Sequence, residues 1–187
     1  MDLRSETDRA RVLELVRECD VFVQGFRWGS FARRGFGPDE LSRVNPRLIY
    51  VEVNAYGFQG PWAERRGWEQ LAQAATGLAD LHSAGREKSA LVPVYINDYG
   101  SGCLGTLGVL AALLRRADEG GSWSVRVALA KTAMLGTRFA ENHEPAVPID
   151  DAELDRYLVD QASPIGLLTR VAPAIGLERS PAYVERA

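Results

Sequence analysis

The sequence predicts an α/β fold in which a parallel sheet carries helices on both of its faces. Three short, mainly apolar runs, at residues 20–23, 48–53 and 124–129, have the length and composition of buried strands. Segments with helical spacing of apolar residues separate them, and this alternation is the pattern of a doubly wound parallel sheet. With 187 residues, 46% of them hydrophobic, the chain is long enough to build one such core.

The first half of the chain supplies clear helix boundaries. Ser5–Asp8 resembles a capping box, and the apolar residues that follow recur at helical spacing, which predicts a helix over residues 6–18. Pro38 suits the first turn of a second helix, and Asn45, which precedes another proline, ends it. Helix, strand, helix and strand therefore follow one another within little more than fifty residues.

The second half continues the alternation after a glycine-containing loop over residues 54–67. An apolar face predicts a helix over 68–81, and residues 91–96 have the composition of a strand. Pro93 restricts such a strand to the edge of a sheet or to the end of a strand. A long helix is predicted over residues 97–116.

The chain divides into two parts near residue 140. Residues 1–140 carry the alternating pattern, whereas residues 141–187 form an acidic and proline-rich connector and arm, with one short helix over 152–159. A solvated surface is the favoured interpretation of the acidic residues. Because the chain opens on a helix without a strand before it, we expect a further strand upstream of Met1.

Composition excludes several classes of protein. The net charge of −3 and the isoelectric point near 5.5 do not suit a nucleic-acid-binding chain. Cys19 and Cys103 lie far apart, without the spacing of a disulfide framework or a metal site. The first residues lack an apolar signal segment, and no apolar run has the length of a membrane span. We therefore expect a cytoplasmic protein with no metal ion and no nucleic-acid or membrane partner.

The segment Ile96–Gly108 is the strongest local candidate for chemistry. Asp98 lies at the start of the long predicted helix, and four glycines follow it within that helix. Each glycine costs a helix roughly 1 kcal/mol against alanine, so close packing against a helix or subunit, or against a ligand, must explain them. Asp98 is either the N-cap of this helix or a nucleophile, and its position alone favours the cap.

Six segments of the chain carry a resemblance to a known family. They are Asp20–Gly29 (DVFVQGFRWG), Arg33–Gly37 (RRGFG), Asn45–Tyr50 (NPRLIY), Gly60-Pro61, Arg66–Ala74 (RGWEQLAQA) and Val94–Gly102 (VYINDYGSG). Their order and spacing resemble those of the class III CoA-transferases, also called the CaiB/BaiF family, which includes formyl-CoA transferase and α-methylacyl-CoA racemase. The resemblance covers about residues 2–140, and it depends on several motifs in register.

The resemblance implies an architecture and a reaction. Family members are intertwined homodimers with a Rossmann-like large domain and a smaller second domain. In the transferases an aspartate before a glycine-containing helix attacks the acyl-CoA thioester, and CoA thiolate and then the acceptor acid resolve the mixed anhydride. Asp98 resembles this aspartate, so we expect it bare at the mouth of a cleft. Acyl-CoA and a carboxylic acid are the implied substrates, and no other cofactor is implied.

The resemblance also implies a binding site. Arg27 and Arg33 stand where the family contacts the CoA nucleotide, and guanidinium groups suit phosphate oxygens. Arg66 matches a position near the pantetheine or the substrate, and Trp68 and Glu69 match a pair that lines the acyl pocket. Without the resemblance, the arginines would be ordinary solvated side chains and Trp68 a core residue.

Some positions depart from the family pattern. The family has Glu-Asn-Phe after its strand, where this chain has Gln24, Gly25 and Phe26. Phe26 stays a candidate CoA contact, but the side-chain amide that would reach the CoA is lost at Gly25. Trp68 stands where the racemases have a histidine that serves in acid-base catalysis, so a racemase is disfavoured.

The resemblance is also limited in extent. The family's first strand and its small domain have no counterpart here, so we expect an incomplete large domain with an internal deletion. Two functions stay open: a class III CoA-transferase that uses Asp98 and is completed by another chain, and a truncated, non-catalytic relative that acts as a binding or interaction subunit. Because unpaired sheet edges invite association, we expect a homodimer or a pairing with a full-length homologue.

Overall fold

The structure is a computed structural model of the chain, and it describes residues 1–83, 87–139, 149–176, 178 and 179. The chain divides into two compact units, Met1–Asn142 and His143–Ala187, and every candidate site residue lies in the first. No helix within the described ranges has the length and apolarity needed to cross a membrane.

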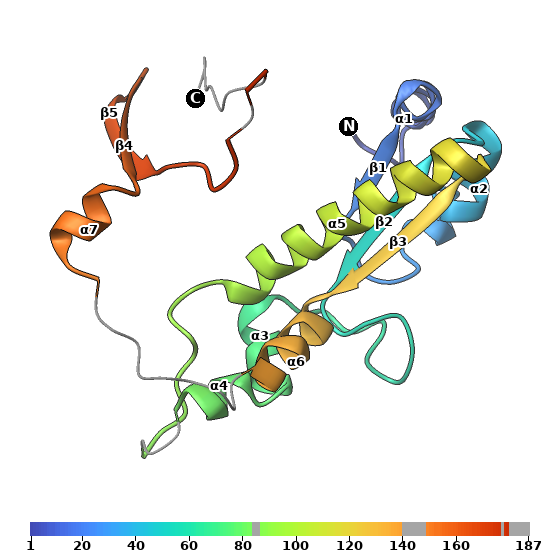
Figure 1. Ribbon diagram of the computed structural model, residues 1–187. Helices are drawn as coiled ribbons and strands as arrows, with labels where there is room; N and C mark the ends of the chain where they lie inside the picture. The colour runs from blue at the N-terminus through green and yellow to red at the C-terminus, as the bar shows by residue number, and fades with distance from the viewer. Residues whose placement is uncertain (84–86, 140–148, 177, 180–187) are drawn as a thin grey trace. The chain divides into compact units, whose positions relative to one another are not determined.

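The first unit is built on a three-stranded parallel sheet, as the sequence predicts. Its strands are β1 (Val21–Gln24), β2 (Ile49–Asn54) and β3 (Trp123–Ala128), in the order β1-β2-β3 (Figure 1). Side chains alternate across the sheet, so neighbouring residues of β2 belong to different cores on opposite faces.

One face of the sheet packs on α1 (Glu6–Glu18), α2 (Pro38–Val44) and the two phenylalanines on either side of a short 3₁₀ helix (Ala32–Arg34). Ser5 caps α1, as the capping-box sequence predicts, because its side chain accepts a hydrogen bond from the backbone N–H of Asp8. The buried residues of this core are Val16, Phe31, Phe36, Leu41, Leu48 and Tyr50.

The opposite face is covered by α5 (Ile96–Glu119), which runs alongside β3 and contacts α6 (Leu129–Phe139) (Figure 1). Ala112 of α5 is buried there with Ile49 and Val51 of β2. The long predicted helix is therefore confirmed, and its position places Asp98 at one end of the sheet.

Close packing within the chain explains two of the helix glycines. A Cβ atom at Gly108 would lie 2.5 Å from Cγ1 of Val125, and one at Gly100 would lie 2.9 Å from Cγ2 of Thr132. Both distances are shorter than van der Waals contact, so α5 approaches β3 and α6 only because these residues lack side chains.

Two predicted elements are wrong. The helix expected over 68–81 is two helices, α3 (Glu69–Ala75) and α4 (Leu78–His82), because Gly77 between them has a φ of 77° that ends the first. The strand expected over 91–96 is not formed. Its backbone N–H at Val92 is bonded by a side chain of α3 instead of a neighbouring strand.

The second unit contains a helix and a hairpin. The helix α7 (Asp151–Asp155) is shorter than predicted, because the chain becomes extended from Leu158 onward. The strands β4 (Leu158–Ser163) and β5 (Gly166–Val171) pair in antiparallel fashion. The two strands of this hairpin are extended, as the proline-rich sequence predicts for this part of the chain.

Candidate active site

Asp98 lies in the first turn of α5, with its side chain exposed to solvent. The N-cap of the helix is Tyr95, whose side chain makes no capping hydrogen bond, so the prediction that Asp98 is the N-cap is wrong. Within the described residues the carboxylate of Asp98 accepts no hydrogen bond, and this leaves both of its oxygens available to a ligand.

The start of α5 is capped by a buried carboxylate from another helix. Glu69 is 2% exposed, and its Oε2 accepts a hydrogen bond from the backbone N–H of Asp98 at 3.1 Å. Its Oε1 accepts from the backbone N–H of Asn97 at 3.2 Å and from Nε2 of Gln73 at 2.8 Å. The first N–H groups of a helix lack partners and carry positive potential, so a buried anion is stabilised there.

The electrostatic surroundings make Asp98 a more basic carboxylate. Partial desolvation raises the pKa of Asp98 above its ordinary value, and the nearby charge of Glu69 raises it further. A more basic carboxylate, once ionised, is a better nucleophile toward an acyl group.

The remaining predicted site residues are spread over the surface around the sheet. Phe26 is exposed and stacks on Phe31, with the ring centroids 4.5 Å apart. Arg33 lies 3.8 Å from a carboxylate oxygen of Glu64. Arg27 and Arg66 are exposed, and the described residues form no ion pair with either.

Trp68 precedes α3 directly and is 58% exposed. The interpretation of Trp68 as a core residue is therefore wrong. Its place beside the acyl group, which the resemblance implies, stays a prediction. Glu69, its neighbour in the sequence, is by contrast one of the most buried residues of the unit.

A polar row across the sheet was not predicted. The strand register aligns Gln24, Glu52 and Arg126. The buried Glu52 accepts hydrogen bonds from Nε2 of Gln24 at 3.0 Å and from Nε of Arg126 at 3.1 Å. The guanidinium of Arg126 also lies 5.0 Å from the ring centroid of Trp28 and 5.3 Å from that of Phe58. Only the pairing of the strands could reveal this row, because its members are far apart in sequence.

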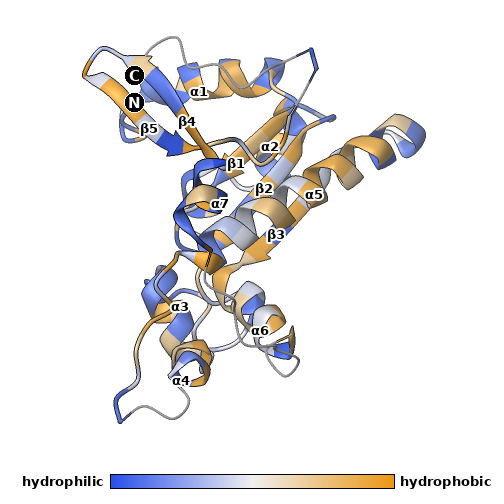
Figure 2. Cartoon of the chain, turned by 60° about the vertical axis from the view of Figure 1, so that its left-hand side comes forward, coloured by the Kyte–Doolittle hydropathy of each residue, from blue (hydrophilic) through white to orange (hydrophobic). Residues whose placement is uncertain are grey.

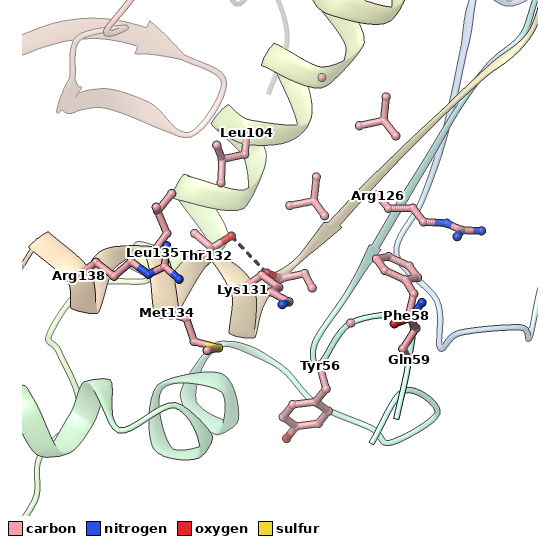
Figure 3. A pocket seen from close by; sticks show the side chains of 15 residues that line it. Tyr56, Phe58, Gln59, Leu104, Arg126, Lys131, Thr132, Met134, Leu135 and Arg138 are labelled. Atoms are coloured by element: carbon pink, nitrogen blue, oxygen red, sulfur yellow. Dashed lines mark hydrogen bonds between the residues drawn. The ribbon is translucent and has the colours of Figure 1, made fainter. Parts of the chain in front are cut away.

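A cavity of about 900 Å³ lies beside β3 and not beside Asp98. Figure 3 shows it between α6, which contributes Lys131, Met134 and Leu135, and the loop that carries Tyr56 and Phe58. Asp98 is not among its lining residues. The expectation that Asp98 is bare is met, but this cavity is not the cleft expected next to it.

The sequence matches the profile of CoA-transferase family III over residues 1–149. The chain belongs to this family. Membership confirms the resemblance carried by the six sequence motifs.

Two relatives named as CoA-transferases match this chain over only part of their own length. Acetyl-coenzyme A transferase nodX of Hypoxylon pulicicidum is 39% identical over 130 residues, which are 66% of this chain and 22% of that protein. The beta subunit of succinyl-CoA–L-malate CoA-transferase of Chloroflexus aurantiacus is 40% identical over 124 residues, 64% of this chain and 30% of that protein.

A crystal structure supports the same relationship. Rv3272 of Mycobacterium tuberculosis matches with a TM-score of 0.68 at 33% identity, over 74% of this chain and 38% of that one. The predicted α/β class is therefore confirmed. This chain spans between about a fifth and two fifths of the length of these three relatives.

We expect Glu69→Gln to lower the pKa of Asp98, because the neutral amide removes the nearby negative charge. The pKa of Asp98 is raised in the folded state, so the folded protein loses stability as the pH rises from the ordinary value of 3.8 through the raised pKa. In the Glu69→Gln variant this loss of stability should be smaller. The measurement is an NMR titration of the Asp98 side-chain carboxyl carbon. Glu64→Gln, at an exposed position, should leave the titration unchanged; a shift of equal size there would contradict the expectation.

Proposed function

We propose that this chain is the Asp98-bearing part of a CoA-transferase that moves CoA between an acyl-CoA and a carboxylic acid. The observation that carries the proposal is the position of Asp98: its backbone is fixed by Glu69, while its carboxylate is exposed and accepts no hydrogen bond from the described residues. Acetyl-CoA and succinyl-CoA, which the names of two relatives contain, indicate the class of donor.

The chemistry would proceed through an aspartyl mixed anhydride. An oxygen of Asp98 attacks the thioester carbonyl carbon, the C–S bond breaks, and CoA leaves as the thiolate. The thiolate attacks the aspartyl carbonyl and releases the donor carboxylate, which leaves an aspartyl-CoA thioester. The acceptor carboxylate displaces CoA to form a second mixed anhydride, and the thiolate attacks its acyl carbon to release the new acyl-CoA and the free Asp98.

The resemblance assigns the binding roles. Arg27 and Arg33 would hold the CoA phosphates through charge-assisted hydrogen bonds, with Phe26 beside the nucleotide. Arg66 and Trp68 would lie along the pantetheine and the acyl group. CoA enters as part of the substrate, and the reaction as written needs no metal ion.

A truncated, non-catalytic relative is the second candidate function. The observation that favours it is the cavity, which leaves Asp98 outside its lining. Such a protein would keep the sheet and a CoA contact but would accumulate no acyl-enzyme.

We expect the chain to form a covalent acyl adduct at Asp98 when it is incubated with radiolabelled acetyl-CoA. Hydroxylamine should remove the label, because anhydrides and thioesters react with it, and Asp98→Ala should abolish labelling. Asp118→Ala, at the other end of α5, is the matched control and should label like the wild type. If this chain stays unlabelled both alone and when mixed with a full-length homologue, the result favours the non-catalytic candidate.

We expect Arg27→Ala to weaken CoA binding by about tenfold or more, since a charge-assisted hydrogen bond to phosphate is worth roughly 1.5–3 kcal/mol. Calorimetric titration with CoA gives the dissociation constant. Arg11→Ala is the control, because Arg11 is exposed on α1 and pairs with Glu14 at 2.9 Å, away from the proposed site. Equal affinities for the Arg27 variant and the wild type would contradict the nucleotide role.

We propose that a second chain covers an apolar stripe on α5. Leu107, Leu110 and Leu114 are 63%, 54% and 71% exposed, and Figure 2 shows hydrophobic residues along this helix. Sedimentation equilibrium at micromolar concentration should give a dimer, and Leu110→Glu should give a monomer. Leu167→Glu, at an equally exposed leucine of the second unit, should stay dimeric. A monomeric wild type would contradict the proposal.

A further inference from the structure

Gln73 is a buried amide that joins three parts of the structure around Asp98. It is 1% exposed and lies one turn after Glu69 on α3. Its Nε2 donates to Oε1 of Glu69 at 2.8 Å and to the carbonyl oxygen of Val94 at 3.4 Å. Its Oε1 accepts from the backbone N–H of Val92 at 2.8 Å.

The partners fix the orientation of this amide. The Val92 N–H can only donate, so it must face the amide oxygen. The Glu69 carboxylate and the Val94 carbonyl can only accept, so they must face the amide nitrogen. A hydrocarbon side chain would leave all three groups without this partner, and a carboxylate would set a second negative charge against Glu69.

These contacts reach Asp98 by two routes. Through Glu69, Gln73 orients the carboxylate that binds the backbone N–H groups of Asn97 and Asp98. Through Val92 and Val94, it holds the segment that leads directly into α5. Neither route involves a contact between Gln73 and the carboxylate of Asp98.

We infer that Gln73 is a positioning residue for the reaction of Asp98, acting through Glu69 and the 92–94 segment. The inference rests on the proposed function, because it concerns the nucleophile named there. Reactions at a carbonyl carbon need the attacking oxygen placed within fractions of an ångström, so a shift of the first turn of α5 lowers the rate without removing the nucleophile.

The first test is Gln73→Leu in the full chain, measured as the rate of acyl adduct formation from radiolabelled acetyl-CoA. We expect a loss of about tenfold or more in this rate, with the dissociation constant for CoA unchanged within about twofold. Gln70→Leu makes the same chemical change on the same helix, at a half-buried position, and should keep the wild-type rate. A Gln73→Leu protein that folds and labels at the wild-type rate overturns the inference.

The Gln73→Glu variant tests the hydrogen bonds of position 73 through the pH dependence of labelling, which a role in packing alone would not change. A protonated carboxyl at this position can donate to Glu69 and accept from Val92, whereas the ionised form can only accept. The labelling rate of this variant, divided by that of the wild type at the same pH, should therefore rise as the pH falls. Glu69 is the titratable side chain that bonds position 73 within the described residues. A ratio that is the same at every pH overturns the inference, and this test remains if Gln73→Leu does not fold.

Amide hydrogen exchange separates this inference from the proposed function. Gln73→Leu should speed exchange at the Asn97 and Asp98 backbone N–H groups, and Gln70→Leu should not. If the wild type forms no adduct, the proposed function fails, while faster exchange at these two amides still supports the positioning network. Unchanged exchange in a folded Gln73→Leu protein shows that Gln73 does not hold the first turn of α5, and the inference fails alone.

Discussion

The arrangement of the candidate site depends on one buried carboxylate, that of Glu69, bound to the first backbone N–H groups of α5. A helix start needs an acceptor, and an aspartate in the first turn is a common one. If Asp98 performed this role itself, hydrogen bonds would stabilise its charge and lower its basicity. Because Glu69 supplies the acceptor from α3, the oxygens of Asp98 stay unbound and its pKa is raised, not lowered. Glu69 thus caps the helix, and the carboxylate of Asp98 stays unbound, as the proposed nucleophilic role requires.

The same constraint, a buried charge that needs donors, governs the polar row across the sheet. Glu52 is buried and receives hydrogen bonds from the strands on both sides of it. A glutamate at position 24, as the family pattern has it, would place two carboxylates at hydrogen-bond distance on adjacent strands. Gln24 avoids this repulsion because its amide nitrogen donates to Glu52 while its oxygen accepts from the Phe26 backbone at 2.8 Å. The departure from the family at position 24 is therefore consistent with the sheet that contains it.

The sequence was informative where local rules decide the structure. The Ser5 cap, the helix start at Pro38 and the three apolar strands each follow from residues within a few positions of one another. Position alone favours Asp98 as the cap of α5, and this interpretation is wrong, because the carboxylate that binds the helix start is Glu69, 29 residues away, which meets it only when α3 packs on α5. The same packing explains the missing strand at 91–96, whose Val92 N–H is bonded by Gln73. Long-range side-chain partners of this kind leave no periodic trace in a sequence.

The exposure of Asp98 bears on which reaction the chain can carry out alone. An aspartyl mixed anhydride reacts with water as well as with thiolates and carboxylates, so transfer requires that water be excluded while the intermediate exists. In this chain Asp98 is open to solvent, and the cavity of about 900 Å³ lies against β3 and α6 instead of around it. Under the proposed function, hydrolysis of the anhydride at this exposed position would compete with transfer of the acyl group. Under the proposed function, the first unit would supply the nucleophile and its positioning, and the second chain proposed above would help to exclude water during transfer.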